Sequence, residues 1–156
     1  MKHKSTVLLL GFVLGLALTG SAAVSGNAKD QAVDLKILPP SVLKAFKAAY
    51  PNAVIKGASK EVEKGVAQYE VESVDGNLNR DLLYLADGKV IEIEETIAPD
   101  HLPAPVKQTL AKDYAGAKVL KAEILTRDSG KAYELSLEFN GKKMGVTVDS
   151  LGKVLK

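Results

Sequence analysis

Two stretches decide the fold of this chain: YEVESVDGNLNRDLLYLADGKV at residues 69–90 and YELSLEFNGKKMGVTVDSLGKV at residues 133–154. Both begin with Tyr-Glu and end with Gly-Lys-Val, and the second lies 64 residues after the first. Extended outward without a gap, residues 38–92 match residues 102–156, with eleven identities in 55 positions. A duplicated unit of this size predicts two copies of one small fold. Positions alike in both copies are expected to serve the fold, and positions that differ are candidates for a role in binding.

Each copy is predicted to be a helix followed by strands. Leu-Pro precedes an apolar stripe at helical spacing, which ends at Tyr50 in the first copy and at Tyr114 in the second. Tyr69, Val71 and Ser73 then alternate with polar residues, as in a sheet with one buried face. The expected strands are residues 53–62, 67–73, 81–86 and 89–96, and residues 117–126, 133–139 and 144–149 with a short fourth strand before Lys156. Asn140-Gly141 and Asp75-Gly76 are the predicted hairpin turns. We therefore expect an α+β fold of two tandem repeats, each one helix packed on a four-stranded antiparallel sheet.

The N-terminal segment has the pattern of a secretory signal peptide. Lys2, His3 and Lys4 precede an apolar run of 12 residues, followed by small residues suited to cleavage near Ala23 or Ala28. A membrane-spanning helix needs roughly 20 residues, so a retained anchor is disfavoured. The predicted organisation is a signal peptide at 1–28, a leader at 29–37, repeat 1 at 38–97, a linker at 98–101 and repeat 2 at 102–156. The mature protein is expected in the periplasm or outside the cell, with no stable membrane anchor.

The composition limits the kinds of partner and of stabilising bond that the sequence predicts. The chain has no cysteine, so its core must hold it together without disulfides. After removal of residues 1–28, basic and acidic side chains balance, which gives no general argument for nucleic acid binding. The charges are unevenly shared: residues 38–100 carry 7 Lys/Arg against 11 Asp/Glu, and residues 101–156 carry 10 against 6. This polarity could steer a charged partner or help the two copies dock, and scattered surface charge is the more usual case.

No catalytic or cofactor motif is found in the sequence. His101 is the one histidine after the signal segment and lies in the linker beside Asp100. The densest acidic run contains Glu92, Glu94 and Glu95. Glu92 and Glu94 would share one face of a strand and could attract a divalent cation, but the six to eight oxygen ligands of a calcium site are not apparent. We predict no catalytic residue, no cofactor and no metal ligand.

Comparison of the two copies singles out a candidate partner site. Leu83 and Leu85 correspond to Thr147 and Asp149, which are predicted to face water. The first copy would then carry two leucines on a face that the second copy keeps polar. The flanking residues would be Gln68, Glu70 and Glu72, giving an apolar spot with an acidic rim, and such spots often mark partner sites. Burial of the leucines against the other copy or the linker is the equally weighted alternative.

These residues carry a family resemblance. The Leu-Pro helix, the Tyr-Glu-Val-Glu strand at 69–72 and the hairpin Tyr84-x-x-Asp87-Gly-Lys-Val-Ile-Glu92 resemble a PepSY-like domain. The tandem form is similar to the exported PepSY-like, beta-lactamase-inhibitor-like family, over residues 38–156. The resemblance implies two helix-on-sheet units whose sheets together form one broad surface. It also implies inhibition of an enzyme or restraint of a protease through that surface. The chain departs from the named inhibitor in having no cysteines.

The expected function is an exported, non-enzymatic module that binds a protein or peptide of the cell envelope through its sheet, as an inhibitor of an envelope hydrolase. A periplasmic sensor or carrier of a small ligand or metal ion is the alternative. An enzyme that uses the acidic face is a third, weaker option.

Overall fold

The computed structural model describes residues 34–155. The predicted signal peptide, its cleavage positions and most of the predicted leader lie outside the described residues. No helix within residues 34–155 is long and apolar enough to span a bilayer.

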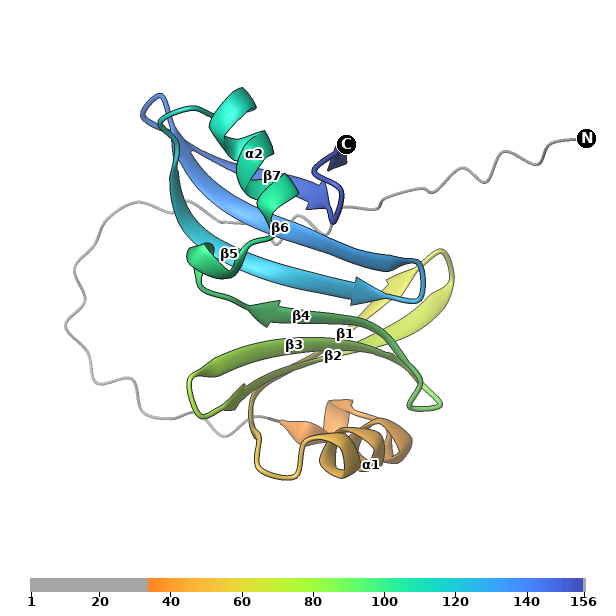
Figure 1. Ribbon diagram of the computed structural model, residues 1–156. Helices are drawn as coiled ribbons and strands as arrows, with labels where there is room; N and C mark the ends of the chain where they lie inside the picture. Colours follow the sequence, from red (N-terminus) through yellow and green to blue (C-terminus); the bar gives the residue numbers. More distant parts are fainter. Residues whose placement is uncertain (1–33, 156) are drawn as a thin grey trace, which may run out of the picture. The chain divides into compact units, whose positions relative to one another are not determined.

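The described chain is α+β, as predicted, with two α-helices and one eight-stranded antiparallel sheet (Figure 1). The strands are hydrogen-bonded in the order in which they occur in the chain. In chain order the elements are η1 (Leu35–Ile37), α1 (Pro40–Ala49), β1 (Val54–Glu63), β2 (Val66–Asp75), β3 (Leu78–Leu85), β4 (Val90–Thr96), η2 (Pro99–His101), α2 (Ala104–Asp113), β5 (Lys118–Arg127), β6 (Gly130–Phe139), β7 (Lys142–Asp149) and β8 (Val154–Leu155).

Pairing of β4 with β5 joins the two halves of the sheet. It runs from Glu92 opposite Arg127 to Thr96 opposite Glu123. The strands of the two repeats therefore continue into one another instead of standing as two separate sheets. The predicted linker contains the 3-10 helix η2, and just before it Ile97 donates its backbone N–H to the Ala122 carbonyl at 2.9 Å.

Both helices begin at a proline-rich turn and end at a tyrosine. Leu38 and Leu102, just before the helices, are 6% and 3% exposed, so their side chains anchor the entry of the chain into each helix. At the other ends, the Tyr50 N–H donates to the Phe46 carbonyl at 2.8 Å, and the Tyr114 N–H donates to the Leu110 carbonyl at 3.0 Å. The repeated Leu-Pro and Tyr positions thus set where each helix starts and stops.

Each helix packs on its own half of the sheet and closes a separate apolar core. The first core joins Val42 and Phe46 of α1 to residues of β2 and β3. The second joins Val106 of α2 to residues of β5, β6 and β7. The aligned tyrosines Tyr69 and Tyr133 are buried, one in each core, which confirms the prediction that they serve the fold.

Strand register shows that both cores lie on the same face of the sheet. Residues directly opposite one another in an antiparallel pair share a face, and neighbours along a strand alternate. Val71 is opposite Leu82, Leu82 is opposite Ile93, Ile93 is opposite Thr126, and the same face continues through β5 to Leu135 and Val146. We call this the helix face, and the opposite side the open face, because no helix of residues 34–155 packs its core there.

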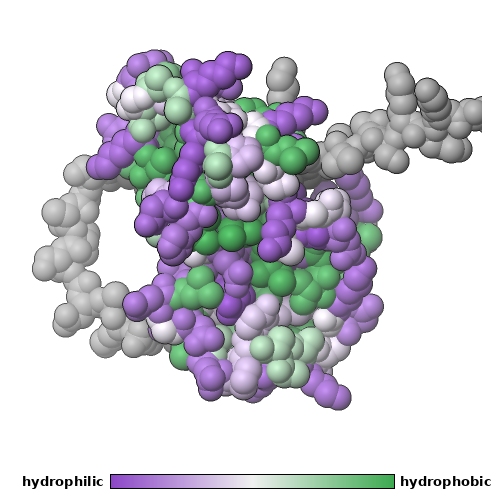
Figure 2. Space-filling view, in the orientation of Figure 1, coloured by the Kyte–Doolittle hydropathy of each residue, from purple (hydrophilic) through white to green (hydrophobic). Residues whose placement is uncertain are grey.

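Apolar side chains also reach the surface of the helix face. In a view with α2 in front of the sheet, hydrophobic surface lies between the regions of the two helices, and smaller apolar areas alternate with hydrophilic residues elsewhere (Figure 2). Ile93 and Ile124 are partly buried against the first and second core respectively. The two cores are therefore linked by β4 and β5 and not by the helices.

Turn residues explain the hairpins, with one correction. Asn140 and Gly141 both have positive φ (51° and 72°), as the predicted two-residue turn requires. The predicted Asp75-Gly76 turn is wrong by one residue, because Asp75 still pairs with Leu78 and the two loop residues are Gly76 and Asn77. The third strand consequently starts at Leu78, three residues earlier than Asp81.

The repeated Gly-Lys-Val positions bring the β3–β4 and β7–β8 turns against the helices. Gly88 has φ +90°, and a Cβ placed on it would lie 2.8 Å from the Ser41 carbonyl oxygen of α1. Gly152 has φ +87°, and its Cβ would lie 2.7 Å from the Pro105 carbonyl oxygen of α2. Side-chain hydrogen bonds hold the same contacts, from Ser41 Oγ to the Ala86 carbonyl and from Thr109 Oγ1 to the Gly152 carbonyl, both at 2.5 Å. Glycine is needed at both turns for its conformation and its size.

Candidate functional site

The open face of the first repeat brings the predicted partner-site residues together. Gln68 lies opposite Leu85, and Glu70 lies opposite Leu83, across the β2–β3 pair. Gln68 is 8% exposed, whereas Leu83, Leu85 and Glu70 are partly buried. Glu72 is exposed and lies opposite Asp81, at the far end of the same strands. Four of the five residues therefore form one patch, and Glu72 borders it.

Hydrogen bonds within this patch use only part of its polar capacity. Glu70 Oε2 accepts from Ser59 Oγ at 3.0 Å, and Glu63 Oε2 accepts from Gln68 Nε2 at 3.3 Å. Glu61 lies opposite Gln68 on β1. Glu61 Oε1 and Gln68 Oε1 are buried, and neither finds a donor among the described residues. Buried polar atoms without a partner are uncommon in folded proteins.

The corresponding part of the second repeat differs in chemistry. Thr147 and Asp149 lie on the open face as predicted, opposite Glu134 and Ala132. Leu125 and Ala132, which align with Glu61 and Gln68, are buried on the open face with 3% and 9% exposure. The second repeat closes this position with apolar groups where the first repeat has oxygen acceptors.

Charge is also unequal between the two halves of the open face. Among the paired strand residues of the first repeat, those with charged side chains on this face are seven carboxylates: Glu61, Glu63, Glu70, Glu72, Asp81, Glu92 and Glu94. In the second repeat four carboxylates are balanced by four basic groups: Glu123, Glu134, Glu138, Asp149, Lys118, Lys121, Arg127 and Lys143. The charge difference between the repeats is therefore concentrated on one half of one face.

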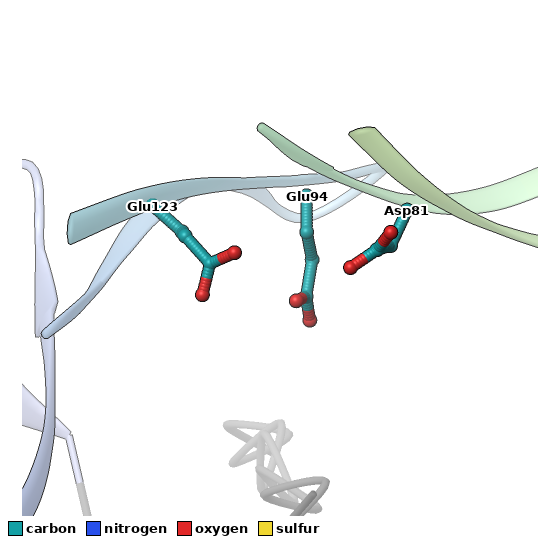
Figure 3. Close-up of side chains that lie close together, drawn as sticks. All are labelled: Asp81, Glu94 and Glu123. Carbon is teal, nitrogen blue, oxygen red and sulfur yellow. The ribbon is translucent and has the colours of Figure 1, made fainter. Parts of the chain in front are cut away.

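Three carboxylates from three strands converge at the junction of the repeats. Asp81 of β3, Glu94 of β4 and Glu123 of β5 each offer an oxygen, and these oxygens lie within 4.8 Å of one another. Figure 3 shows the three side chains projecting from the same side of the strands. Glu123 is 8% exposed and pairs with Lys121 Nζ at 2.7 Å. Nearby, Glu92 forms an ion pair with Arg127. Glu123 in the cluster and Glu92 beside it are therefore paired with basic groups.

This environment raises the pKa of Glu94 to about 8. Burial is the largest cause, followed by a hydrogen bond with Glu92 and by the negative charges of Glu92, Glu134 and Glu123. The pKa of Asp81 is raised by burial and by the charge of Glu70, and that of Glu134 by burial and by Glu123 and Glu92. Crowded carboxylates in a half-buried site favour protonation or the approach of a cation.

The sequence singled out Glu94 as a residue that could attract a cation, but the prediction was no metal ligand, and Asp81 and Glu123 were not singled out. Both stand out in the alignment of the repeats, where Asp81 matches Gly145 and Glu123 matches Ser59. That comparison was the available signal, but it could not show that the β4–β5 pairing brings the two residues together. His101 and Asp100, by contrast, are exposed in η2 and lie outside this cluster.

Comparison with known proteins identifies the tandem repeat. The family model described as "Putative beta-lactamase-inhibitor-like, PepSY-like" matches the chain twice, at residues 24–92 and 67–156. Among curated proteins, none matches the chain.

Several solved structures share the fold at low sequence identity. A BLIP-like protein from Bacteroides fragilis is 21% identical, with a TM-score of 0.59 over 76% of this chain and 84% of that one. A DUF2874 family protein from Bacteroides uniformis is 15% identical, with a TM-score of 0.63 over 76% and 86%. A protein from Bacteroides eggerthii described as "putative periplasmic" is 20% identical, with a TM-score of 0.63 over 76% and 86%.

Proposed function

Because the chain belongs to the PepSY-like, beta-lactamase-inhibitor-like family, we propose that it is an exported, non-enzymatic module that binds a protein or peptide through the open face of its sheet. We take one helix and the four strands that follow it as the duplicated unit. The observation that carries the proposal is the patch around Leu83 and Leu85. It combines partly buried leucines with unpaired buried acceptors on a face that neither helix covers.

Inhibition of an envelope hydrolase is the specific form of this function that we propose. The family description and the BLIP-like fold of the Bacteroides fragilis protein support it. A rigid sheet surface suits such a role because little conformational entropy is lost when a preformed surface binds. The target is a protein of the cell envelope, in keeping with the predicted signal peptide and the periplasmic description of the Bacteroides eggerthii protein. Sequencing of the mature N-terminus, with cleavage expected after Ala23 or Ala28, tests the export step.

Capture of a partner by matched variants tests the binding proposal. Wild-type protein immobilised in periplasmic extract is expected to retain a stoichiometric protein partner, identified by mass spectrometry. Leu83→Lys is expected to abolish capture, because it places a charge in the apolar part of the patch. Leu151→Lys is the matched control: Leu151 is 83% exposed in the turn before β8, and the variant should capture as wild type does.

Circular dichroism and thermal melting of both variants accompany the capture experiment. A Leu83→Lys protein that fails to fold would place Leu83 in the core. A folded variant that still captures the partner would contradict the proposed face.

A metal-ion sensor or carrier is the second candidate, because Asp81, Glu94 and Glu123 converge. Carboxylate oxygens are the ligands that Ca²⁺ prefers, but three residues would supply only part of its six to eight ligands. Calorimetric titration with Ca²⁺, compared between wild type and Glu94→Gln, distinguishes this function from protein binding. Heat that saturates in wild type and is lost in the variant would support it.

A further inference from the structure

Two buried oxygen atoms on the open face lack the donors that they need. Gln68 is 8% exposed, and its Nε2 is directed toward Glu63. Since a carboxylate only accepts, this hydrogen bond fixes the amide with its nitrogen toward Glu63 and leaves Oε1 for another donor. Glu61 lies directly opposite Gln68 and also has a buried Oε1 without a partner among the described residues. Two hydrogen-bond acceptors at neighbouring positions are thus without an N–H or O–H donor among the described residues.

The charge around these acceptors favours a cationic donor. The pKa of Glu61 is raised by burial and then by the negative charges of Glu70, Glu63 and Glu92. Glu92 lies three strands away from Glu61 in the sheet, so carboxylates of β1 and β4 influence one another across this face. Among the paired residues of β1–β4, no Lys or Arg lies on the open face to offset them. Lys56 lies in the bulge between Ile55 and Gly57, at the other end of β1 from Glu61. A positive group from outside would meet Glu61, Glu63 and Glu70 around the two acceptors, with no base among the paired residues facing them.

The fold does not require these acceptors. The second repeat has Leu125 and Ala132 at the positions of Glu61 and Gln68, and both are buried. Leaving a polar atom buried and unpaired costs roughly 1–3 kcal/mol in general. A bound state in which Glu61 Oε1 and Gln68 Oε1 receive hydrogen bonds would remove this cost.

We propose that the open face of the first repeat takes a lysine or arginine side chain of the protein partner. Its N–H groups bond to Glu61 Oε1 and Gln68 Oε1, and its aliphatic stem lies along Leu83 and Leu85. A metal ion fits this position less well, because the two leucines and a neutral amide border it. The inference rests on the proposed function and specifies the partner as a basic segment with apolar neighbours.

A library of random peptides displayed on phage, selected on the immobilised full-length protein, provides the probe. Selected peptides are expected to be enriched in Lys or Arg next to apolar residues. Their affinity should fall with added salt, because a charge-assisted contact is screened. In the selected peptides, replacement of the basic residue by norleucine should weaken binding about tenfold or more, as expected for a hydrogen bond to a charged group.

Variants of the protein distinguish the contribution of the two acceptors to peptide binding from that of the overall negative charge of the face. Glu61→Gln removes the charge, and Glu61→Leu and Gln68→Ala install the residues of the second repeat, so their folding is expected to be retained. Each should weaken binding of the selected peptides about tenfold. Glu138→Gln is the matched control: it removes one carboxylate from the balanced half of the open face and should leave affinity unchanged. Circular dichroism verifies the fold of each variant.

The outcomes distinguish the inference from the proposed function. Enriched peptides without Lys or Arg that still depend on Leu83 would overturn the basic-side-chain inference and leave the binding module standing. Equal loss of affinity in Glu61→Gln and Glu138→Gln would also overturn it, since general acidity would then suffice. No enrichment of any peptide, together with no captured partner, would overturn both.

Discussion

The position of Glu94 in the sheet changes the pKa of its carboxyl group. It lies on the open face of β4, where Leu125 is opposite on β5 and Asp81 is opposite on β3. Its carboxyl group shares a half-buried site with Asp81 and Glu123, and the pKa of Glu94 rises to about 8. Folding therefore takes up a proton near neutral pH at this residue.

The stability of the protein should fall as pH rises toward 8. The folded pKa of Glu94 is about 8, above the ordinary carboxyl value of 4.5, so between these values the folded state binds more protons than the unfolded state. By linkage, stability is fully present below pH 4.5 and is lost as pH rises through 8. After allowance for solvent screening, the loss at Glu94 is roughly 1–2 kcal/mol.

Urea unfolding of wild type and Glu94→Gln at pH 5.5 and pH 8.5 measures this loss. The amide does not titrate, so the variant should lose less stability between the two pH values. An identical pH dependence in the two proteins would contradict the assignment. Addition of Ca²⁺ at pH 8.5 should stabilise wild type only if the second candidate function is correct.

At the scale of elements, each helix is held to the sheet by a glycine turn as well as by its apolar stripe. Gly88 touches the first turn of α1, and Gly152 touches the first turn of α2. Duplication has kept this contact together with the Lys and Val that follow. The repeated Gly-Lys-Val is thus a contact between a turn and a helix, which the sequence marked as structural without showing its partner.

Gly88→Ala should destabilise the protein by about 3 kcal/mol. The alanine must adopt a positive φ, which costs about 1–2 kcal/mol, and its Cβ must also displace the backbone of α1. Gly65→Ala is the control, because Gly65 has φ +82° but nothing lies within 4 Å of its added Cβ. Chemical denaturation should show the control losing only the conformational part. Equal losses in the two variants would show that the contact with Ser41 is easily relieved.

At the scale of the whole molecule, two cores share one sheet. Five residue pairs between β4 and β5 connect the repeats, from Glu92 opposite Arg127 to Thr96 opposite Glu123. Separation of the repeats would expose long edges of β4 and β5, and each repeat is near the size at which a single small core is marginal. The two repeats are therefore expected to unfold together.

Phe46→Ala tests this coupling. Phe46 is 1% exposed in the first core, and its truncation should cost about 3–5 kcal/mol. Calorimetry should show one transition at a lower temperature, because loss of the first core removes the edge support of the second repeat. Two transitions, the upper one at the wild-type temperature, would show that the repeats are independent.

Much of the fold was predictable because its signals are local. Alternation along 69–73 and 133–139 gave the buried face, and the Leu-Pro and Tyr positions gave the helix limits. The predicted turn at Asp75 was displaced by one residue, because Gly76 and Asn77 together form the loop. The position of the loop depends on the pairing register of the two strands, which the local sequence does not fix. The continuous sheet depends on the pairing of β4 with β5, which belong to different repeats. No single stretch of sequence predicts that pairing.

The candidate site was predictable only where it lies within one repeat. Leu83, Leu85, Gln68 and Glu70 are brought together by a hairpin, so alternation sufficed to place them on one face. Asp81, Glu94 and Glu123 meet because a strand of one repeat pairs with a strand of the other. The unpaired oxygens of Glu61 and Gln68 depend on side-chain burial, which periodicity does not describe. Whether the leucines bind a partner stays a prediction.

The order of the strands has a consequence for how the chain reaches this structure. Each strand from β2 to β8 pairs with the strand before it in sequence, so no strand needs a partner from a distant part of the chain. A contact between segments that are near each other in sequence closes only a small loop. Proteins rich in such contacts fold quickly. A polypeptide that emerges N-terminus first can add each hairpin to the growing edge as it appears. A chain that emerges on the far side of the membrane from its N-terminus can thus fold in the order in which it emerges.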